Sequence, residues 1–397
     1  MVDKAPRLKA SQLGPIQAAD ITFGDLTVLL GPQASGKSLL LQTLRLILDA
    51  PHVVQRLTLE GYEWDDARGF AGAFYGEGME ALWSPASTRV SWQGRAVSLS
   101  ALAKTKSAAI GVPRPTWRLY VPAHRAITFR NSWPRHFGDY SVGDPFVLRE
   151  FSDELRTVIA IQSRRQRNAL FPLSVGQQSL FSDFAMSIGA QRLLETSVYG
   201  GFQLKHERHG LQKRLVLQQG ADSPLPFLVW STGQRELSPL LLSCLPLLDP
   251  EHAREAVGTW VVMEEPEMGL HPRAIVAVLF LLLELLAKGY RICVSTHSPH
   301  VLDLLWALRV LAEKNADPAW VLRLFDLEPE PDNLAVAKSA LAKTIKVYYL
   351  DRQEAKAIDV SRLDPDSPNV HETSWGGLTE WSTKTADVIA DFVANQA

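Results

Sequence analysis

The stretch that decides the fold is Gly31-Pro32-Gln33-Ala34-Ser35-Gly36-Lys37-Ser38, between an apolar run, Leu26–Leu30, and a helical pattern that begins at Leu39. It has the form G-x-x-x-x-G-K-S, the phosphate-binding loop (P-loop), whose glycines let backbone N–H groups and a helix N-terminus point at phosphate oxygens. Lys37 can reach the β and γ phosphates of a nucleotide, and Ser38 can supply a Mg²⁺ ligand. The expected nucleotide contacts therefore run from Gly31 through Leu39. An ordinary glycine-rich turn is the weaker interpretation, because strand, loop and helix follow in the required order.

The composition is that of a globular protein. With 397 residues, 46% hydrophobic and 21% charged, the chain can build one large or two ordinary domains. A formal net charge of -2 excludes a global basic field, so any contact with nucleic acid must come from a local patch. The two cysteines, Cys244 and Cys293, lie in apolar runs, which favours buried thiols in a reducing compartment. The longest apolar run, Ala274–Leu283, is shorter than the roughly 20 residues of a membrane span, and no signal sequence is evident. We therefore expect a cytoplasmic protein with no membrane partner.

Residues 1–143 read as the first part of a nucleotide-binding domain that carries a β subdomain. Strand patterns precede the P-loop, and others follow it at Val53–Leu59 and Trp117–Val121. A hairpin is predicted over Thr88–Leu99, with its turn at Gln93-Gly94. The aromatic, glycine-rich segment Gly61–Trp83 reads as an ordered loop.

Residues 144–218 predict an inserted helical subdomain. Helical spacing covers Asp144–Arg167 and Gln177–Tyr199, and a hairpin follows, with strands at Phe202–Lys205 and Leu211–Gln218. The nucleotide fold resumes over residues 219–397. Its predicted elements are a helix Glu236–Leu248, a strand Thr259–Met263, a helix Arg273–Lys288, a strand Tyr290–Ser295, a helix to Asn315, a loop at Glu328–Asp332, a strand pair Ile345–Leu350 and Ile358–Val360, and a closing helix from Lys384. This alternation implies an α/β fold with a largely parallel sheet covered on both faces.

Two carboxylates end one of the predicted strands. Glu264 and Glu265 follow the apolar run Trp260–Met263, and adjacent residues at a strand end point different ways. One acid can then join the Mg²⁺ shell while the other faces a water and the γ-phosphate. We assign Glu264 to the metal and Glu265 to the role of base. Taken alone, the pair fits a solvated acidic turn before Pro266 equally well.

A family resemblance becomes specific at this point. Glu264-Glu265-Pro266-Glu267-Met268-Gly269-Leu270-His271-Pro272 resembles the Walker B and D-loop of ABC-type ATPases, in the SMC/RecF/OLD-like branch often described as AAA domains. Ser231-Thr232-Gly233-Gln234-Arg235 matches the signature motif of that family, and His297 matches its switch histidine. The motifs follow one another in the order of the family and cover the chain from Leu26 to about Val301.

The resemblance implies the ABC-ATPase form of the P-loop NTPase fold, with a mixed β sheet, an N-terminal β subdomain and an inserted helical lobe. It implies ATP and Mg²⁺ as cofactors, with Ser38 and Glu264 as the metal ligands. It also implies a head-to-tail homodimer, in which the signature residues of one copy bind the γ-phosphate held by the other. Those signature residues are Ser231, Gly233 and Gln234. The catalytic residues implied in this arrangement are Lys37, Glu265 and His297.

The sequence departs from the family pattern at three places. Thr232 stands where the signature has glycine, and Glu264 stands where many relatives have aspartate. The glutamine of the Q-loop is not evident. Pro122-Ala123-His124-Arg125 occupies about its place, which makes Arg125 a candidate for coupling the nucleotide to the helical lobe.

The resemblance favours an ATPase that drives or gates a separate effector, a nuclease or toxin, in bacterial anti-phage defence. The alternatives are a RecF/SMC-like ATPase of DNA repair or maintenance, and a nucleotide-regulated scaffold with little turnover. A transporter motor is disfavoured by the length of Leu39–Trp230, and a long-armed ATPase by the lack of heptads. DNA is an alternative partner, through basic residues at Arg164–Arg167 and at Arg208, His209, Lys213 and Arg214; a solvated helix face is the commoner explanation of such clusters.

Overall fold

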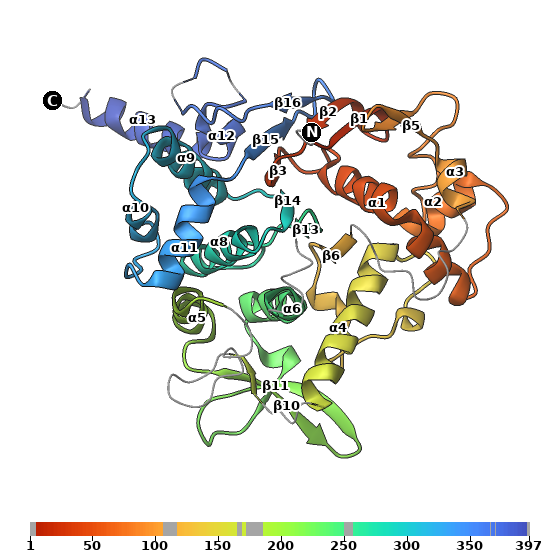
Figure 1. The fold of residues 1–397 in the computed structure, drawn as a ribbon, viewed down its shortest axis with the longest axis horizontal. Helices are drawn as coiled ribbons and strands as arrows, with labels where there is room; N and C mark the ends of the chain where they lie inside the picture. Colours follow the sequence, from red (N-terminus) through yellow and green to blue (C-terminus); the bar gives the residue numbers. More distant parts are fainter. Residues whose placement is uncertain are drawn as a thin grey trace.

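The computed structural model describes residues 5–105, 117–164, 169–171, 186–249, 257–365, 367–369 and 371–394 (Figure 1). A six-stranded sheet forms the centre, in the order β16 (Ala357–Asp359), β15 (Ile345–Leu350), β3 (Leu26–Leu30), β14 (Arg291–Ser295), β13 (Trp260–Glu264) and β6 (Trp117–Val121). All neighbouring pairs are parallel except β15 and β16. The predicted α/β fold with a mixed, largely parallel sheet is therefore confirmed.

Alternate side chains of the central strands enter two separate hydrophobic cores. On β3, Val28 and Leu30 pack into the core that contains α6 (Thr232–Leu248) and α8 (Pro272–Ala287). Leu29 points the other way, into the core that contains α1 (Lys37–Leu59). Helices thus cover both faces of the sheet, as the apolar strands required.

Helix α1 corrects one prediction. The run Val53–Leu59 was expected to be a strand, but it forms the second half of α1. Its buried residues, at positions 50, 53, 54 and 57, follow helical spacing rather than alternation. The backbone leaves helical geometry at Asp49 (φ -148°, ψ 40°), two residues before Pro51, because proline restricts the turn that precedes it.

The N-terminal sheet has the order β2 (Ile16–Thr22), β1 (Arg7–Leu13), β4 (Arg89–Trp92), β5 (Arg95–Val97), followed by α3 (Leu99–Ala103). The predicted hairpin is confirmed, and its turn residues Gln93 and Gly94 both have positive φ. The segment Gly61–Trp83 is not only loop. It contains α2 (Ala67–Tyr75), which is capped by Asp66 and buries Phe70 and Phe74.

The segment after β6 begins with a small hairpin, β7 (Phe129–Arg130) and β8 (Trp133–Pro134), and continues into α4 (Phe146–Arg164) and α5 (Ile188–Leu194). A second four-stranded sheet follows the order β12 (Leu225–Pro226), β11 (Gln212–Gln218), β10 (Gln203–His209), β9 (Ala169–Phe171). The lobe therefore contains a sheet as well as helices. The predicted hairpin exists, but β10 extends to His209, so the turn lies at Gly210-Leu211. Much of the predicted helix Gln177–Tyr199 lies outside the described residues, and the boundaries 144 and 218 stay predictions.

The last quarter of the chain adds further helices, and the first and third of them contact α8. They are α9 (Pro299–Glu313), α10 (Ala319–Arg323), α11 (Pro331–Leu341), α12 (Ser374–Gly377) and α13 (Glu380–Ala394). The loop predicted at Glu328–Asp332 ends where α11 begins, at Pro331, and the closing helix begins four residues before Lys384. Within the described ranges, no helix is both long and apolar enough to span a membrane.

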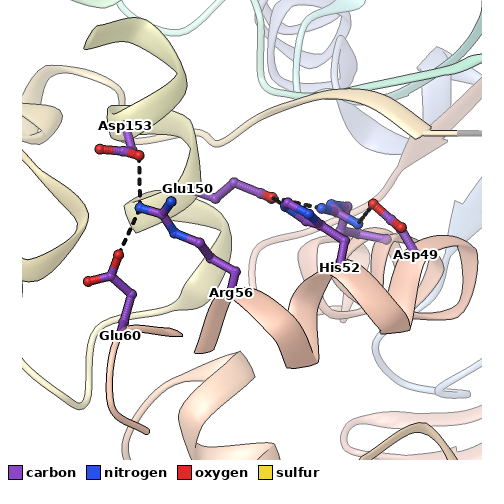
Figure 2. Close-up of polar contacts among 7 residues, drawn as sticks. Asp49, His52, Arg56, Glu60, Glu150 and Asp153 are labelled. Atoms are coloured by element: carbon purple, nitrogen blue, oxygen red, sulfur yellow. Dashed lines mark hydrogen bonds and ion pairs between the residues drawn. The ribbon is translucent and has the colours of Figure 1, made fainter. Parts of the chain in front are cut away.

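A group of buried and half-buried ion pairs joins α1 to α4 (Figure 2). The guanidinium of Arg45, fully buried, lies 2.8 Å from Glu150 and 3.3 Å from Asp49. His52 reaches the same Glu150 carboxylate at 2.8 Å. One turn further, Arg56 contacts Glu60 and Asp153 at 2.9 and 2.8 Å. The helix that follows the P-loop is thus tied to the first helix of the lobe.

Candidate functional site: a P-loop and two carboxylates at one edge of the sheet

The P-loop connects the end of β3 to α1, and its backbone has the form that its glycines allow. Gly31 has φ 135° and Gly36 has φ 96°, so both lie in the region that favours glycine. A Cβ on Gly31 would lie 2.4 Å from the carbonyl oxygen of Leu350 on β15. A Cβ on Gly36 would lie 2.7 Å from the side chain of Ile16 on β2. Space as well as torsion therefore requires glycine at both positions.

Lys37 is the first residue of α1 and folds back over the loop. Its Nζ donates to the carbonyl oxygens of Gly31 and Pro32, at 2.8 and 2.9 Å. The side chain is buried, with 6% of the residue exposed, and this burial lowers its pKa from 10.5 to about 8. The carboxylates of Glu265, Glu264 and Glu267 act in the opposite direction. The ammonium group of Lys37 is therefore hydrogen-bonded to backbone carbonyl oxygens, which phosphate oxygens can replace as acceptors.

Glu264, at the end of β13, is buried beside the P-loop serine. Its Oε2 accepts a hydrogen bond of 2.5 Å from Ser38 Oγ, and its Oε1 accepts one from the hydroxyl of Tyr120 on β6. Burial raises the pKa of Glu264, while these two hydrogen bonds lower it. Ser38 and Glu264 thus present two oxygen atoms at one point, as a shared Mg²⁺ shell requires. Tyr120 was not predicted to be part of the site.

Glu265 and His297 face each other across the ends of β13 and β14. Glu265 Oε1 lies 3.5 Å from His297 Nε2, and both side chains are about one third exposed. The backbone of Glu265 has φ 43°, uncommon for a residue other than glycine, and its N–H donates to Ser295 O at 2.9 Å. Burial and the charge of Lys37 lower the pKa of His297, against the effect of Glu265. The structure places the proposed base and the switch histidine side by side, both open to solvent.

Glu267 has a role that the sequence reasoning missed. The carboxylate is buried, and its Oε1 accepts hydrogen bonds from Thr296 Oγ1 at 2.6 Å and from the backbone N–H of His297 at 2.9 Å. Burial raises its pKa, which these hydrogen bonds oppose. Glu267 therefore ties the D-loop to the loop that carries the switch histidine. The sequence feature that could have identified Glu267 as a site residue is its position as the third acid in Glu264-Glu265-Pro266-Glu267.

The signature residues form the start of α6. Ser231 is its N-cap: Ser231 Oγ accepts from Gln234 N at 3.3 Å, and Gln234 Oε1 accepts from Ser231 N at 3.1 Å. The helix begins at Thr232, four residues before the predicted start at Glu236. Ser231 and Thr232 are exposed, and among the described residues no side-chain hydrogen bond joins Ser231 or Gln234 to the P-loop. A Cβ on Gly233 would lie 3.1 Å from Gly269 O, so the signature packs on the D-loop.

Arg125 lies in the loop after β6 and is fully buried. It donates to the carbonyl oxygens of Glu264 at 2.9 Å, Glu265 at 3.1 Å and Glu236 at 2.9 Å. The residue singled out in the Q-loop position thus contacts both the Walker B end and the signature helix. Glu236, its partner in α6, was not predicted.

Comparison with known proteins gives one family match and several structural ones. Residues 121–303 match the family described as AAA domain, putative AbiEii toxin, Type IV TA system. No curated protein sequence matches the chain. An Smc head bound to the C-winged helix domain of ScpA is 13% identical, with a TM-score of 0.37 and coverage of 73% of this chain and 88% of that chain.

Two further solved structures are similar at the same level. The Smc head with an extended coiled coil, bound to the C-terminal domain of ScpA derived from Pyrococcus furiosus, is 12% identical, with a TM-score of 0.39 and coverage of 89% and 96%. The SMC head domain from Thermotoga maritima is 14% identical, with a TM-score of 0.32 and coverage of 76% and 91%. The family match contains Glu264, Glu265 and His297, and the P-loop stands upstream on the adjoining strand β3. Residues 121–303 are thus similar to an AAA-domain family, and the α/β fold with its P-loop is that of a P-loop nucleotide-binding protein.

Proposed function

We propose that the chain binds ATP with Mg²⁺ and hydrolyses it in a head-to-tail homodimer. The observation that carries this proposal is the meeting of three groups at the carboxyl ends of adjacent strands. Lys37 follows β3, Glu264 ends β13 with Glu265 directly after it, and His297 follows β14. Nucleotides bind at that edge in open α/β sheets.

The residues present fit both nucleotide and metal. The Nζ of Lys37 leaves the carbonyl oxygens of Gly31 and Pro32 and binds the β and γ phosphates. Ser38 Oγ and Glu264 Oε2, 2.5 Å apart, form the hard oxygen donor set that Mg²⁺ prefers. Bound there, the ion would neutralise charge on the phosphate oxygens.

Hydrolysis is assigned to the exposed pair. Glu265 orients the attacking water and accepts its proton, because its carboxylate is the acid at this edge that is neither buried nor hydrogen-bonded to Ser38. His297, kept neutral by a lowered pKa, donates to the γ-phosphate. Glu267 holds the backbone of His297 in place for this contact.

The second half of the site is assigned to another copy. Ser231 is exposed at the N-terminus of a 17-residue helix, where backbone N–H groups favour an anion. Such a site is completed by the γ-phosphate bound to the P-loop of a partner copy. The effector, a nuclease or toxin on another chain, responds when the two copies close around ATP. The toxin–antitoxin system in the description of the matching family supports a role in bacterial defence.

Phosphate release by the wild type and by Glu265→Gln tests the enzyme assignment. We expect steady release by the wild type and a fall of about 10²-fold or more in the variant. Equal rates would favour the alternative, a scaffold that uses ATP to set its assembly without appreciable turnover.

A basic groove on the lobe favours a second candidate, an ATPase that acts on nucleic acid. The groove is a hollow of about 420 Å³ lined by β7, β8, α4 and β11. It adjoins a hollow of about 280 Å³, with which it shares Asn131, Gln212 and Lys213. Among the described side chains that line the larger hollow, Arg130, Arg135, Arg156 and Lys213 are cationic and Asp139 is the one acid. This excess contrasts with a nearly neutral chain, and phosphates match it.

The predicted basic cluster contributes only in part. Lys213 lines both hollows, and His209 and Arg214 line the smaller one. Arg214 is paired with Glu207 at 2.6 Å, and Arg208 donates to Gly210 O. Residues 165–167 lie outside the described residues.

Binding of single-stranded and duplex DNA across a salt series tests this candidate. The double variant Arg130→Glu, Lys213→Glu should bind more weakly and flatten the salt slope by about one unit or more. Lys338→Glu, on the exposed side of α11, is the matched control. Binding that does not depend on salt, or an equal loss of DNA affinity in the control, would exclude the groove as a DNA-binding surface.

A further inference from the structure

Tyr120 and Glu264 stand on neighbouring strands and project to the same side of the central sheet. Tyr120 is the partner of Val262 in the pairing of β6 with β13, and Glu264 follows Val262 by two residues. Because side chains alternate along a strand, all three lie on one face. Tyr120 and Val262 belong to the hydrophobic core that contains α1, so this is the face that α1 covers. Ser38, in the first turn of α1, reaches the same carboxylate from the helix side.

The two carboxylate oxygens of Glu264 have different partners. Oε1 accepts a hydrogen bond from the hydroxyl of Tyr120, and Oε2 accepts one of 2.5 Å from Ser38 Oγ. A tyrosine hydroxyl keeps its proton at neutral pH, so it is a donor to the carboxylate. Tyr120 and Glu264 are 2% and 4% exposed, which leaves little room for water to take its place. Oε2 is therefore the oxygen directed at the P-loop, and Oε1 is held on the other side.

A carboxylate can bind a metal ion through one oxygen or through both. Ca²⁺ takes roughly six to eight oxygen ligands in flexible geometry and often uses both oxygens of one carboxylate. Mg²⁺ is smaller and requires a nearly octahedral shell, in which a carboxylate supplies one oxygen. With Oε1 bonded to Tyr120, Glu264 offers one oxygen beside the hydroxyl of Ser38. This donor set suits Mg²⁺ and withholds a ligand that Ca²⁺ could use.

We propose that Tyr120 is a positioning residue that makes the cation site select Mg²⁺ over Ca²⁺, because its hydroxyl restricts Glu264 to one metal-binding oxygen. The inference rests on the proposed function, since it concerns the cation that is bound with ATP. It requires neither hydrolysis nor a second copy of the chain. In Tyr120→Phe the aromatic ring remains in the core, and Oε1 becomes available to a metal ion.

The test measures the dissociation constant of a fluorescent, non-hydrolysable ATP analogue for the full chain in excess Mg²⁺, in excess Ca²⁺ and in EDTA. For the wild type we expect tighter binding with Mg²⁺ than with Ca²⁺, and the weakest binding in EDTA. For Tyr120→Phe we expect binding with Mg²⁺ to weaken by about tenfold and binding with Ca²⁺ to change by less than about threefold. A general loss of structure would weaken binding with both ions equally, so the ratio of the two constants reports the positioning role.

Tyr75→Phe is the matched control. Tyr75, at the end of α2, is also 2% exposed, and its hydroxyl lies 2.9 Å from Thr43 Oγ1 on α1. The variant thus loses a buried tyrosine hydroxyl that contacts the P-loop helix but no carboxylate. It should keep the wild-type ratio of the constants in Ca²⁺ and Mg²⁺.

The outcomes separate the inference from the function on which it rests. An unchanged ratio in Tyr120→Phe, an equal change in Tyr75→Phe, or a wild type that does not distinguish the two ions would each overturn the role of Tyr120. Equal binding of the analogue in Mg²⁺ and in EDTA would overturn it as well, together with the metal ligands Ser38 and Glu264. If the ratio shifts as expected but the wild type releases no phosphate and does not dimerise, the role of Tyr120 stands and the proposed function fails.

Discussion

The buried carboxylate of Glu267 accepts a hydrogen bond of 2.9 Å from the backbone N–H of His297, and another of 2.6 Å from the hydroxyl of Thr296. Glu267 and His297 are 30 positions apart in the chain. Through them the D-loop, which follows β13, determines where the loop after β14 is held.

We predict that Glu267→Ala lowers the rate of ATP hydrolysis more than it lowers ATP affinity. The substitution leaves a buried N–H and a hydroxyl without their acceptor, at a cost of about 1–3 kcal/mol, and frees the switch histidine. Steady-state kinetics and urea unfolding measure the two effects. Glu267→Gln retains an acceptor oxygen and should recover much of the loss; a Gln variant as impaired as the Ala variant would contradict the role given to this contact.

Glu265→Gln should bind ATP and accumulate as a dimer. The amide keeps the size of the side chain but cannot accept a proton. ATP is therefore not hydrolysed, and the ATP-bound dimer does not dissociate. Sedimentation with and without ATP measures the assembly. A variant that remains monomeric at saturating ATP would remove the head-to-tail arrangement.

The affinity for ATP should fall as the pH rises above about 8. The pKa of Lys37 in the free protein is about 8, and phosphate favours the charged form, so binding above that pH requires uptake of a proton. The dissociation constant then rises with pH, by up to about tenfold per unit. Calorimetry in buffers of different ionisation heat would detect the uptake at pH 8.5.

Lys37→Ala is the control for that titration. The variant should lose nucleotide binding, because the cation that faces the phosphates is gone. Undiminished affinity, or an unchanged pH profile in whatever binding remains, would show that another group titrates.

Glu150→Ala should destabilise the fold by about 3–5 kcal/mol. Arg45 is fully buried, and the substitution removes the carboxylate that it and His52 both reach. Asp153→Ala breaks the pair with Arg56, in which both side chains are about one quarter exposed, and should cost about 1 kcal/mol or less. Urea unfolding measures the free energy of unfolding of each variant. Equal losses of stability would contradict the expectation that the more deeply buried ion pair contributes more.

The sequence predicted those parts of the fold whose signal is local. The apolar strands β3, β13 and β14 and the acids that end β13 can be read directly, because each motif is continuous in the chain. Val53–Leu59 misled because two adjacent valines favour a strand, whereas burial at positions 50, 53, 54 and 57 selected a helix.

The connections between motifs could not be predicted. The hydrogen bonds that join Arg125 to Glu236 and Glu264 cross 111 and 139 positions. Tyr120 meets Glu264 only because β6 and β13 are neighbours in the sheet. Such contacts depend on strand order, which residue spacing does not specify.

The carbonyl oxygen of Leu350 lies against Gly31. Strand β3 is paired on both sides with strands from much later in the sequence, β14 and β15. On the ribosome, the loop is made before residue 40 is passed, yet its neighbouring strands are made after residue 290. Until then the apolar strand Leu26–Leu30 has no permanent place and needs protection from aggregation. A nucleotide bound at the P-loop would therefore stabilise this sheet only once β14 and β15 have been synthesised.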